Sequence, residues 1–191
     1  AAWRPETKDR APHGTVLIFP GRTEYIEKYG PAAAQFAARG FATLVVDWRG
    51  QGLTARAKPD RRLGHIDDFA EYQNDVAVIV DVARQAGLPK PWYLLGHSMG
   101  GCIGLRAMMD GVFSVENRQL CGAVFSAPMW GLALPAAGRK IAHGAARTAV
   151  RFGLGRKRAR GLSSETTYVL DSPFEGNVLV QDPQTWERFR R

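Results

Sequence analysis

One serine lies in the most informative stretch of this chain, Gly96-His97-Ser98-Met99-Gly100. The apolar run at 92–95 predicts a buried strand, and the small and apolar residues that follow the serine are typical of a packed helix. A serine that attacks a carbonyl group needs a sharp turn between a strand and a helix. Glycines two positions before and after the serine let the two elements approach closely. This context predicts a nucleophilic Ser98, with Gly96 and Gly100 as the glycines of the turn.

A structural role for Ser98 is the alternative, because serine also caps helices that begin directly after it. The flanking strand and the small-residue helix favour the nucleophile. The sequence shows no cysteine or histidine clusters at metal-ligand spacing and no phosphate-binding loop, so we expect no metal and no cofactor.

The composition is that of one folded globular domain: 191 residues, of which 45% are hydrophobic and 23% charged. No apolar run has the length of a transmembrane helix, and the first residues contain no apolar segment typical of a signal peptide. The two cysteines, Cys102 and Cys121, fall in predicted core elements, so we expect buried free thiols and a cytoplasmic location.

Strands and helices are predicted to alternate along the first 130 residues. The strands are expected at 15–19, 41–46, 92–95 and 120–126, and the helices at 31–39, at 69–86 and directly after Ser98. Because these strands are continuously apolar, they predict a mostly parallel sheet with helices on both faces.

Four stretches of the sequence together resemble the α/β-hydrolase superfamily, and within it the bacterial lysophospholipases and monoacylglycerol lipases. The stretches are FPGRTE at 19–24 with Lys28-Tyr29, DWRGQG at 47–52, LGHSMGG at 95–101 and FSAP at 125–128. The resemblance implies an α/β-hydrolase fold whose N-terminal part of the core covers 1–130, with an inserted helical cap at 131–191. We expect the chain to stop within that cap.

The resemblance also implies two backbone donors that bind an oxyanion. One is the N–H of Met99, the residue after the nucleophile. The other comes from the loop after the first strand, where this chain has Pro20-Gly21-Arg22 in place of the family's usual His-Gly and a small residue. By position, Arg22 supplies that N–H; an ordinary glycine turn is the alternative. Asp47 is expected to have a structural role in the next loop.

The catalytic base and acid are harder to place. In this superfamily the acid and then the histidine follow the serine along the chain. The histidine after Ser98 is His143, and none of the later acidic residues follows a recognisable core strand: Asp110, Glu116, Glu165, Asp171, Glu175, Asp182 and Glu187. We therefore expect the acid and the histidine to lie outside this chain, which alone would have little activity. A degenerate site, or His143 as an unusual base, is the alternative.

The histidines before the serine or beside it have structural interpretations. His97 is expected to be a packing residue, because adjacent side chains on such a turn point apart. His65 is expected to be a loop or helix-start contact, and His13 has no functional interpretation.

The segment Arg139–Arg160 carries eight basic residues and no acidic residue. Its charge of +8 equals the formal net charge of the whole chain. Its helical spacing, with basic residues on one side and apolar ones on the other, suits contact with an anionic membrane surface. A solvated helix face is the alternative, and nucleic acid is not expected as a partner.

Taken together, these features predict a serine hydrolase that cleaves carboxylic esters of single-chain lipids, lysophospholipid or monoacylglycerol, through an acyl-enzyme on Ser98. Its location would be cytoplasmic, with peripheral membrane contact. A non-catalytic binding module on the same fold, or an inactive fragment, is the alternative.

Overall fold

The computed structural model describes residues 1–5, 11–56, 64–113, 120–131, 134–155, 173–177 and 180–190, with the side chains of 188–190 excepted. The chain divides into two compact units, Ala1–Ala142 and His143–Arg191, and each is described by itself. Its elements are β1 (Ala2–Trp3), β2 (Gly14–Phe19), η1 (Ile26–Tyr29), α1 (Gly30–Ala38), β3 (Phe41–Val45), η2 (Phe69–Glu71), α2 (Tyr72–Gln85), β4 (Trp92–His97), α3 (Met99–Met109), β5 (Leu120–Ser126), α4 (Ala136–Arg151) and α6 (Pro183–Arg190).

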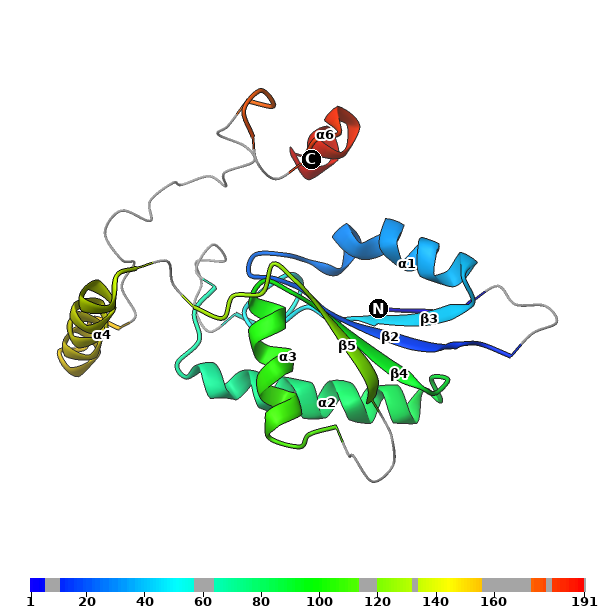
Figure 1. The fold of residues 1–191 in the computed structure, drawn as a ribbon, viewed down its shortest axis with the longest axis horizontal. Coiled ribbons are helices and arrows are strands. Elements are labelled where there is room, and N and C mark those ends of the chain that lie inside the picture. The colour runs from blue at the N-terminus through cyan, green and yellow to red at the C-terminus, as the bar shows by residue number, and fades with distance from the viewer. Residues whose placement is uncertain are drawn as a thin grey trace. The chain divides into compact units, whose positions relative to one another are not determined.

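The first unit is built on a five-stranded sheet with the strand order β1-β3-β2-β4-β5 (Figure 1). The neighbouring pairs among β2, β3, β4 and β5 are parallel, which confirms the predicted mostly parallel sheet. Strand β1 is antiparallel to β3, with Ala2 opposite Leu44, and was not predicted. Two residues are too few to leave a periodic pattern in the sequence.

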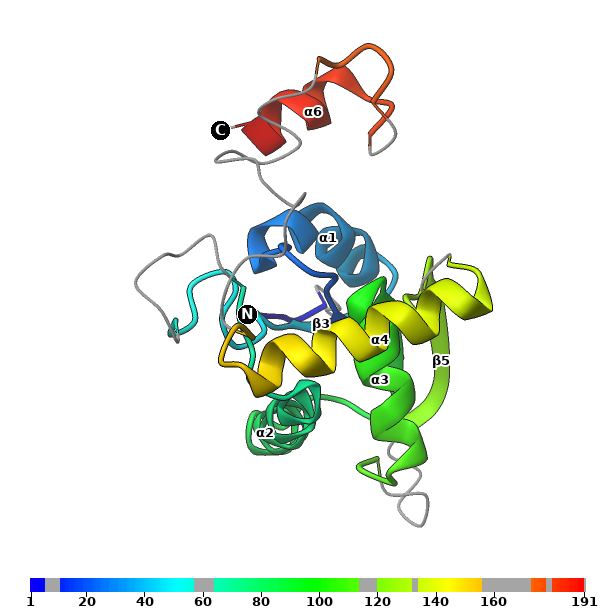
Figure 2. The ribbon, with the colours of Figure 1, turned by 90° about the vertical axis from the view of Figure 1, so that its left-hand side faces the viewer.

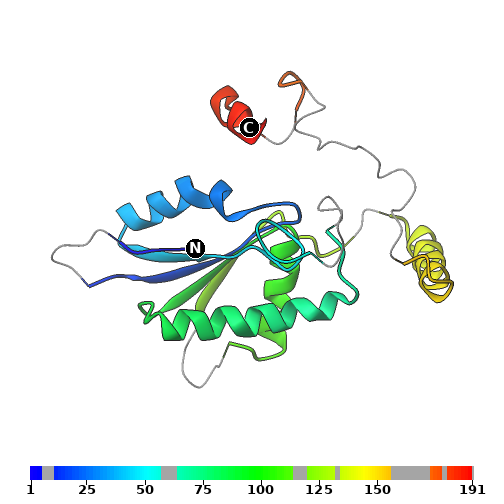
Figure 3. The same cartoon turned by 180° about the vertical axis from the view of Figure 1, so that it is seen from behind.

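Helices cover both faces of this sheet, as the continuously apolar strands predict. Helix α1 lies on one face, and α2 and α3 lie on the other (Figures 2 and 3). The side chains of β2 divide accordingly. Val16 and Ile18 pack in the cluster that contains Phe36 of α1, whereas Leu17 and Phe19 belong to the larger cluster with α2 and α3.

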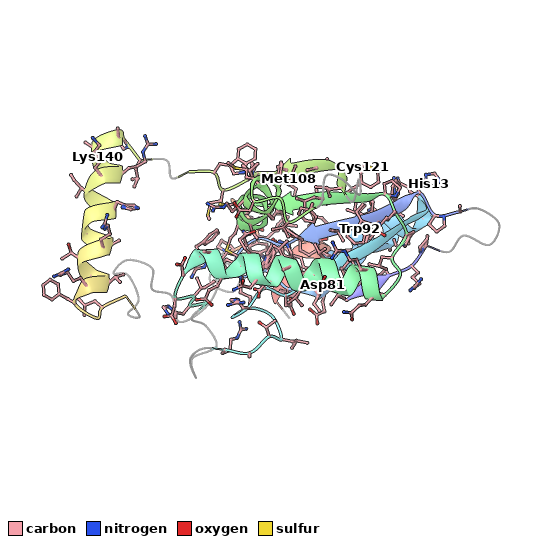
Figure 4. All side chains as sticks on the ribbon, turned by 90° about the horizontal axis from the view of Figure 1, so that it is seen from below. His13, Asp81, Trp92, Met108, Cys121 and Lys140 are labelled. Carbon is pink, nitrogen blue, oxygen red and sulfur yellow. The ribbon has the colours of Figure 1, made fainter. Side chains whose placement is uncertain are left out.

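Helix α2 illustrates how local signals place an element. Asp68 and Glu71 form a capping box: the Ala70 N–H donates to Asp68 Oδ1 at 2.8 Å, and the Asp68 N–H donates to Glu71 Oε1 at 3.2 Å. The predicted helix at 69–86 thus begins as the short turn η2 and continues as α2. Trp92 of β4, labelled in Figure 4, packs in the same buried cluster as Val80 and Ala83 of α2, whereas Asp81 of that helix is exposed.

Burial at β5 differs from the prediction. The strand was expected to be buried, but among the described residues it is the outermost strand of the sheet, and Val124 is 64% exposed. For the same reason Cys121 is exposed, while Cys102 in α3 is half-buried; both are free thiols. The expectation that both cysteines are buried was therefore wrong, because an edge strand exposes residues that a central strand would cover.

Helices α4 and α6 follow the last strand of the sheet along the chain. No residue of α4 is buried, and its exposed positions include Lys140 (Figure 4). Helix α6 follows Asp182, whose Oδ2 accepts the Thr185 N–H at 2.8 Å, and it contains the buried Trp186. Within the described parts of the chain, no helix combines the length and the apolar character needed to cross a bilayer.

Candidate active site

Ser98 occupies a strained turn between β4 and α3. Its backbone has φ 49° and ψ −118°, in a region that residues with a side chain rarely adopt. The end of β5 holds this turn: the Ser98 N–H donates to the Ser126 carbonyl, and the Ser98 carbonyl accepts the N–H groups of Gly101 and Met129, each at 3.0 Å. The turn is therefore fixed from both sides of the serine.

The Ser98 side chain does not cap α3. A capping serine has an extended backbone and accepts a hydrogen bond from the first turn of its helix. Ser98 has neither feature, and its half-buried hydroxyl has no hydrogen-bond partner among the described residues. The alternative of a purely capping serine therefore finds no support in the geometry.

The glycines around Ser98 are required by close approach. A Cβ atom on Gly100 would lie 2.0 Å from the Phe19 carbonyl oxygen, and one on Gly96 would lie 2.8 Å from the Cα of Gly101. These distances are far below van der Waals contact, so any larger residue would push α3 away from the strands. Helix α3 thereby begins against the end of β2.

The loop after β2 lies beside the serine. A Cβ on Gly21 would be 3.2 Å from the Cβ of Ser98. The Gly21 N–H donates to Glu24 Oε2 at 2.5 Å, and the Thr23 N–H donates to Gln51 Oε1. Between them, the N–H of Arg22 has no acceptor among the described residues. Met99, the other predicted donor, is the first residue of α3.

The loop after β3 supports the loop after β2. The indole N–H of the buried Trp48 donates to the Pro20 carbonyl at 2.9 Å. Asp47 accepts the Ile26 N–H on Oδ1 and the Leu53 N–H on Oδ2, both at 3.0 Å. These bonds confirm the predicted structural role of Asp47, which ties the two loops together.

Glu24 is a residue whose position sequence reasoning missed. Its carboxylate, 10% exposed, accepts hydrogen bonds from Lys28 and from Tyr29, the latter at 2.5 Å, in addition to the Gly21 N–H. Burial raises the pKa of Glu24, but these three donors outweigh burial and hold the pKa below its ordinary value. Burial and the adjacent Glu24 carboxylate raise the pKa of Tyr29. The i, i+4 spacing of Glu24 and Lys28 is the signal that could have revealed the pair.

Positive φ angles cluster at one edge of the sheet. Among the described residues, those with a side chain and a positive φ are Thr23, Ser98 and Ala127, at 62°, 49° and 43°. They follow β2, β4 and β5, which run parallel and therefore end at the same edge. Strained backbone of this kind collects at functional sites, which makes this edge the candidate site.

The histidines of the first unit are His13, His65 and His97, and each contacts a neighbouring residue other than Ser98. His97 Nε2 lies 3.7 Å from Glu24 Oε1, and His65 Nε2 lies 2.9 Å from Asp67 Oδ1. The His13 ring packs against Phe41 with the ring centroids 5.4 Å apart. In the described part of this unit, no histidine or carboxylate forms a hydrogen bond with Ser98.

The acidic residues after Ser98 do not assemble a base for it in the described structure. Asp110 pairs with Arg106 at the far end of α3, and Asp182 caps α6. Glu175 and Glu187 are exposed, as is His143 in α4. Glu116, Glu165 and Asp171 lie outside the described residues.

A cavity of about 250 Å³ lies between the loop after β3, at Arg49 and Gly50, and the start of α2, and it is not lined by Ser98. Arg49 lines this cavity. Its guanidinium donates to both carboxylate oxygens of Asp75, with the NH2 group 2.7 Å from Oδ1, and also to Glu71. Among the described residues, no three histidine, cysteine, aspartate or glutamate side chains gather in a way that could hold a metal ion.

Residues 10–188 match the family model of the serine aminopeptidases S33 (Hydrolase_4). The chain belongs to this family of α/β hydrolases. The match confirms the resemblance and the fold that the four sequence stretches predicted.

Two relatives of this S33 chain are bacterial enzymes. Lysophospholipase L2 of Escherichia coli (strain K12) is 34% identical over 185 residues, which cover 91% of this chain and 48% of the relative. Phospholipase YtpA of Bacillus subtilis (strain 168) is 34% identical over 121 residues, which cover 63% of this chain and 42% of the relative. The S33 chain thus spans about half the length of these relatives or less.

A solved structure shares the fold. The crystal structure of a soluble variant of monoglyceride lipase from Saccharomyces cerevisiae, in complex with a substrate analogue, superposes with a TM-score of 0.57 at 23% identity. The match covers 79% of the S33 chain and 47% of the lipase.

Proposed function

We propose that this chain carries the nucleophile of a serine hydrolase that cleaves carboxylic esters of single-chain lipids through an acyl-enzyme on Ser98. The observation that carries the proposal is the backbone of Ser98. Its positive φ projects the residue from a tight turn, and its hydroxyl has no hydrogen-bond partner among the described residues. Membership of the S33 family supports the same assignment.

The chemistry follows from the position of the hydroxyl. Ser98 Oγ attacks the ester carbonyl carbon while a base removes its proton, and the carbonyl oxygen becomes an oxyanion. The ester C–O bond then breaks, and the alcohol leaves with that proton. A water molecule hydrolyses the acyl-enzyme and releases the fatty acid, which regenerates the serine.

The proposed oxyanion donors are the backbone N–H groups of Met99 and Arg22. Met99 begins α3, so its N–H lies at the positive end of the helix dipole. Arg22 lies in the loop that reaches Ser98 through Gly21, and its N–H has no acceptor among the described residues. A main-chain donor needs no particular side chain, which makes arginine acceptable at this position.

Apolar side chains next to the serine support a substrate with an acyl chain. Met129, whose N–H is bonded to the Ser98 carbonyl, and Trp130 are 39% and 58% exposed. The ring of Trp130 lies 5.4 Å from that of Phe125. The name of the relative lysophospholipase L2 favours a lysophospholipid, and monoacylglycerol is the competing substrate of the same class.

We place the hydrolase core in residues 1–130 and a cap in 131–191. The base and the acid would come from residues that this 191-residue chain does not contain. A serine without a base is a weak nucleophile at neutral pH, so we expect little turnover by the 191 residues alone.

The test is covalent labelling by a fluorophosphonate probe, followed by hydrolysis of short p-nitrophenyl esters, lysophosphatidylcholine and monoacylglycerol. Both the 191-residue chain and the protein at its natural length in its source organism are assayed. Ser98→Ala should abolish labelling and turnover. Ser126→Ala, at the end of the neighbouring strand, is the matched control and should retain both. Neither labelling nor turnover at natural length would instead favour a non-catalytic binding module.

The exposed helix α4 supports a second proposal, peripheral contact with an anionic membrane on the cytoplasmic side. Its described side chains include Arg139, Lys140 and Arg147 but no acidic residue, and Ile141 and Val150 are 72% and 65% exposed. An exposed helix of this composition binds negatively charged lipid surfaces.

Co-sedimentation tests the membrane proposal. The chain should bind vesicles that contain phosphatidylglycerol and not vesicles of phosphatidylcholine alone, and binding should weaken with added salt. The charge reversal Arg147→Glu should reduce it, whereas Arg39→Glu, at the residue that directly follows α1, is the control and should not. Equal binding by both variants would leave α4 as a solvated helix.

A further inference from the structure

We propose that Glu24 is a positioning residue of the candidate active site, whose carboxylate holds the turn at 20–23 so that the Arg22 N–H faces the reacting carbonyl at Ser98. This inference rests on the proposed function and adds to it a residue that acts without touching substrate.

The carboxylate binds one backbone N–H group and two side chains. Oε2 accepts the Gly21 N–H and the Tyr29 hydroxyl, each at 2.5 Å, and Oε1 pairs with Lys28. Lys28 and Tyr29 belong to η1, whereas Gly21 belongs to the turn beside Ser98. Glu24 therefore fastens the turn to the helical segment that leads into α1.

Within the turn at 20–23, the Arg22 N–H is the backbone donor that has no acceptor among the described residues. The N–H before Arg22 is bound to Glu24 and the one after it, on Thr23, is bound to Gln51. The Pro20 carbonyl is bound to Trp48. With these neighbours fixed, the peptide that carries the Arg22 N–H has little freedom to rotate. A donor held in place before the reaction stabilises an oxyanion without a cost of reorganisation.

A carboxylate near a developing oxyanion would repel it if its charge were unpaired. In this structure Lys28 and Tyr29 occupy the carboxylate, and the imidazole of His97 lies 3.7 Å away. The lowered pKa of Glu24, in which these donors outweigh burial, keeps the group ionised near neutral pH. The ionised form binds the Gly21 N–H more strongly than a neutral acceptor does.

Nuclear magnetic resonance tests the contact directly in the 191-residue chain. Pro20-Gly21 is the one Pro-Gly pair in the sequence, so 13C-carbonyl proline combined with 15N-glycine isolates the Gly21 amide. We expect a downfield, slowly exchanging Gly21 proton. In Glu24→Gln it should move upfield and exchange about tenfold faster or more, because a charged acceptor is lost. Glu27→Gln, an exposed carboxylate of η1, is the matched control and should change neither.

Kinetics on the protein at natural length test the consequence. Glu24→Gln, which retains an acceptor oxygen, should lower kcat for a p-nitrophenyl ester about tenfold, and Glu24→Ala should lower it on the order of 100-fold. KM should change much less, because the oxyanion contact forms only in the transition state. If the two Glu24 variants instead lost activity because they misfold, both would lose it to the same extent. The fraction of protein that the fluorophosphonate probe labels would then also fall.

Two results would overturn the inference: an unchanged Gly21 amide in Glu24→Gln, or an equal fall in kcat in Glu27→Gln. If the wild-type protein neither labels nor turns over any ester, the proposed function fails. The Gly21 amide then decides separately whether Glu24 holds the turn.

Discussion

The α-carbon of Gly100 lies against the carbonyl of Phe19, so closely that a methyl group at position 100 would be 2.0 Å from that oxygen. This contact joins the start of α3 to the end of β2. It therefore places the turn that carries Ser98 next to the loop that carries Arg22.

Gly100→Ala tests that contact. Because the neighbouring atoms are backbone and move only with the strand, we expect the free energy of unfolding to fall by about 3 kcal/mol. Urea denaturation followed by circular dichroism measures it. Gly30→Ala, at a helix position with nothing within 4 Å of the added methyl group, should change stability by less than about 1 kcal/mol. Equal effects of the two substitutions would show that α3 does not depend on close packing here.

The ionisation of Glu24 predicts a pH dependence of stability. Burial alone would raise the pKa of Glu24, but the donors Lys28, Tyr29 and Gly21 lower it below the ordinary value of 4.5. The folded state then binds fewer protons than the unfolded state. The contribution to stability is present above pH 4.5 and is lost as the pH falls through the folded-state pKa.

Glu24→Gln should accordingly be less stable than the wild type at pH 7, and the difference should shrink as the pH is lowered toward 3. Chemical denaturation at a series of pH values measures both curves. Glu27→Gln serves as the matched loss of one charge. A difference that stays constant down to pH 3 would contradict the assigned hydrogen bonds.

Two aspartates on α2 separate a partly buried ion pair from an exposed one. Asp75 binds the Arg49 guanidinium with both carboxylate oxygens, and its side chain is 21% exposed. Asp81 pairs with Arg84, and its side chain is 61% exposed. Asp75→Asn should cost about 1–2 kcal/mol in thermal or urea unfolding, and Asp81→Asn less than about 0.5 kcal/mol. The reverse order would rule out a stabilising role of the Arg49 contacts.

The two free thiols should differ in reactivity. Cys121 is exposed on the edge strand β5, whereas Cys102 is half-buried in α3. In the 191-residue chain, we expect Cys121 to react with a thiol reagent such as DTNB about tenfold faster than Cys102, and Cys121→Ser should remove the fast phase. A fast phase that persists in that variant would mean that Cys102 is the accessible thiol.

Much of the first unit follows from local patterns. Apolar runs predicted β2, β3 and β4 to within about two residues, because strands buried on both faces of a parallel sheet consist almost entirely of apolar residues. The capping residues Asp68 and Glu71 mark the start of the helix at 69–86 in the same way. The exposure of Cys121 was missed, because position at the edge of a sheet depends on which strands pair and not on the strand's own residues.

The sequence by itself determined the family, the mostly parallel sheet and the serine between its two glycines, since each depends on residues close together in the chain. Only the tertiary structure decided which groups surround that serine. The bonds of Trp48 to Pro20, of Gln51 to Thr23 and of Met129 to Ser98 join segments up to 31 residues apart. No spacing rule predicts such contacts, because they exist only after the carboxyl ends of four parallel strands have been brought to one edge of the sheet.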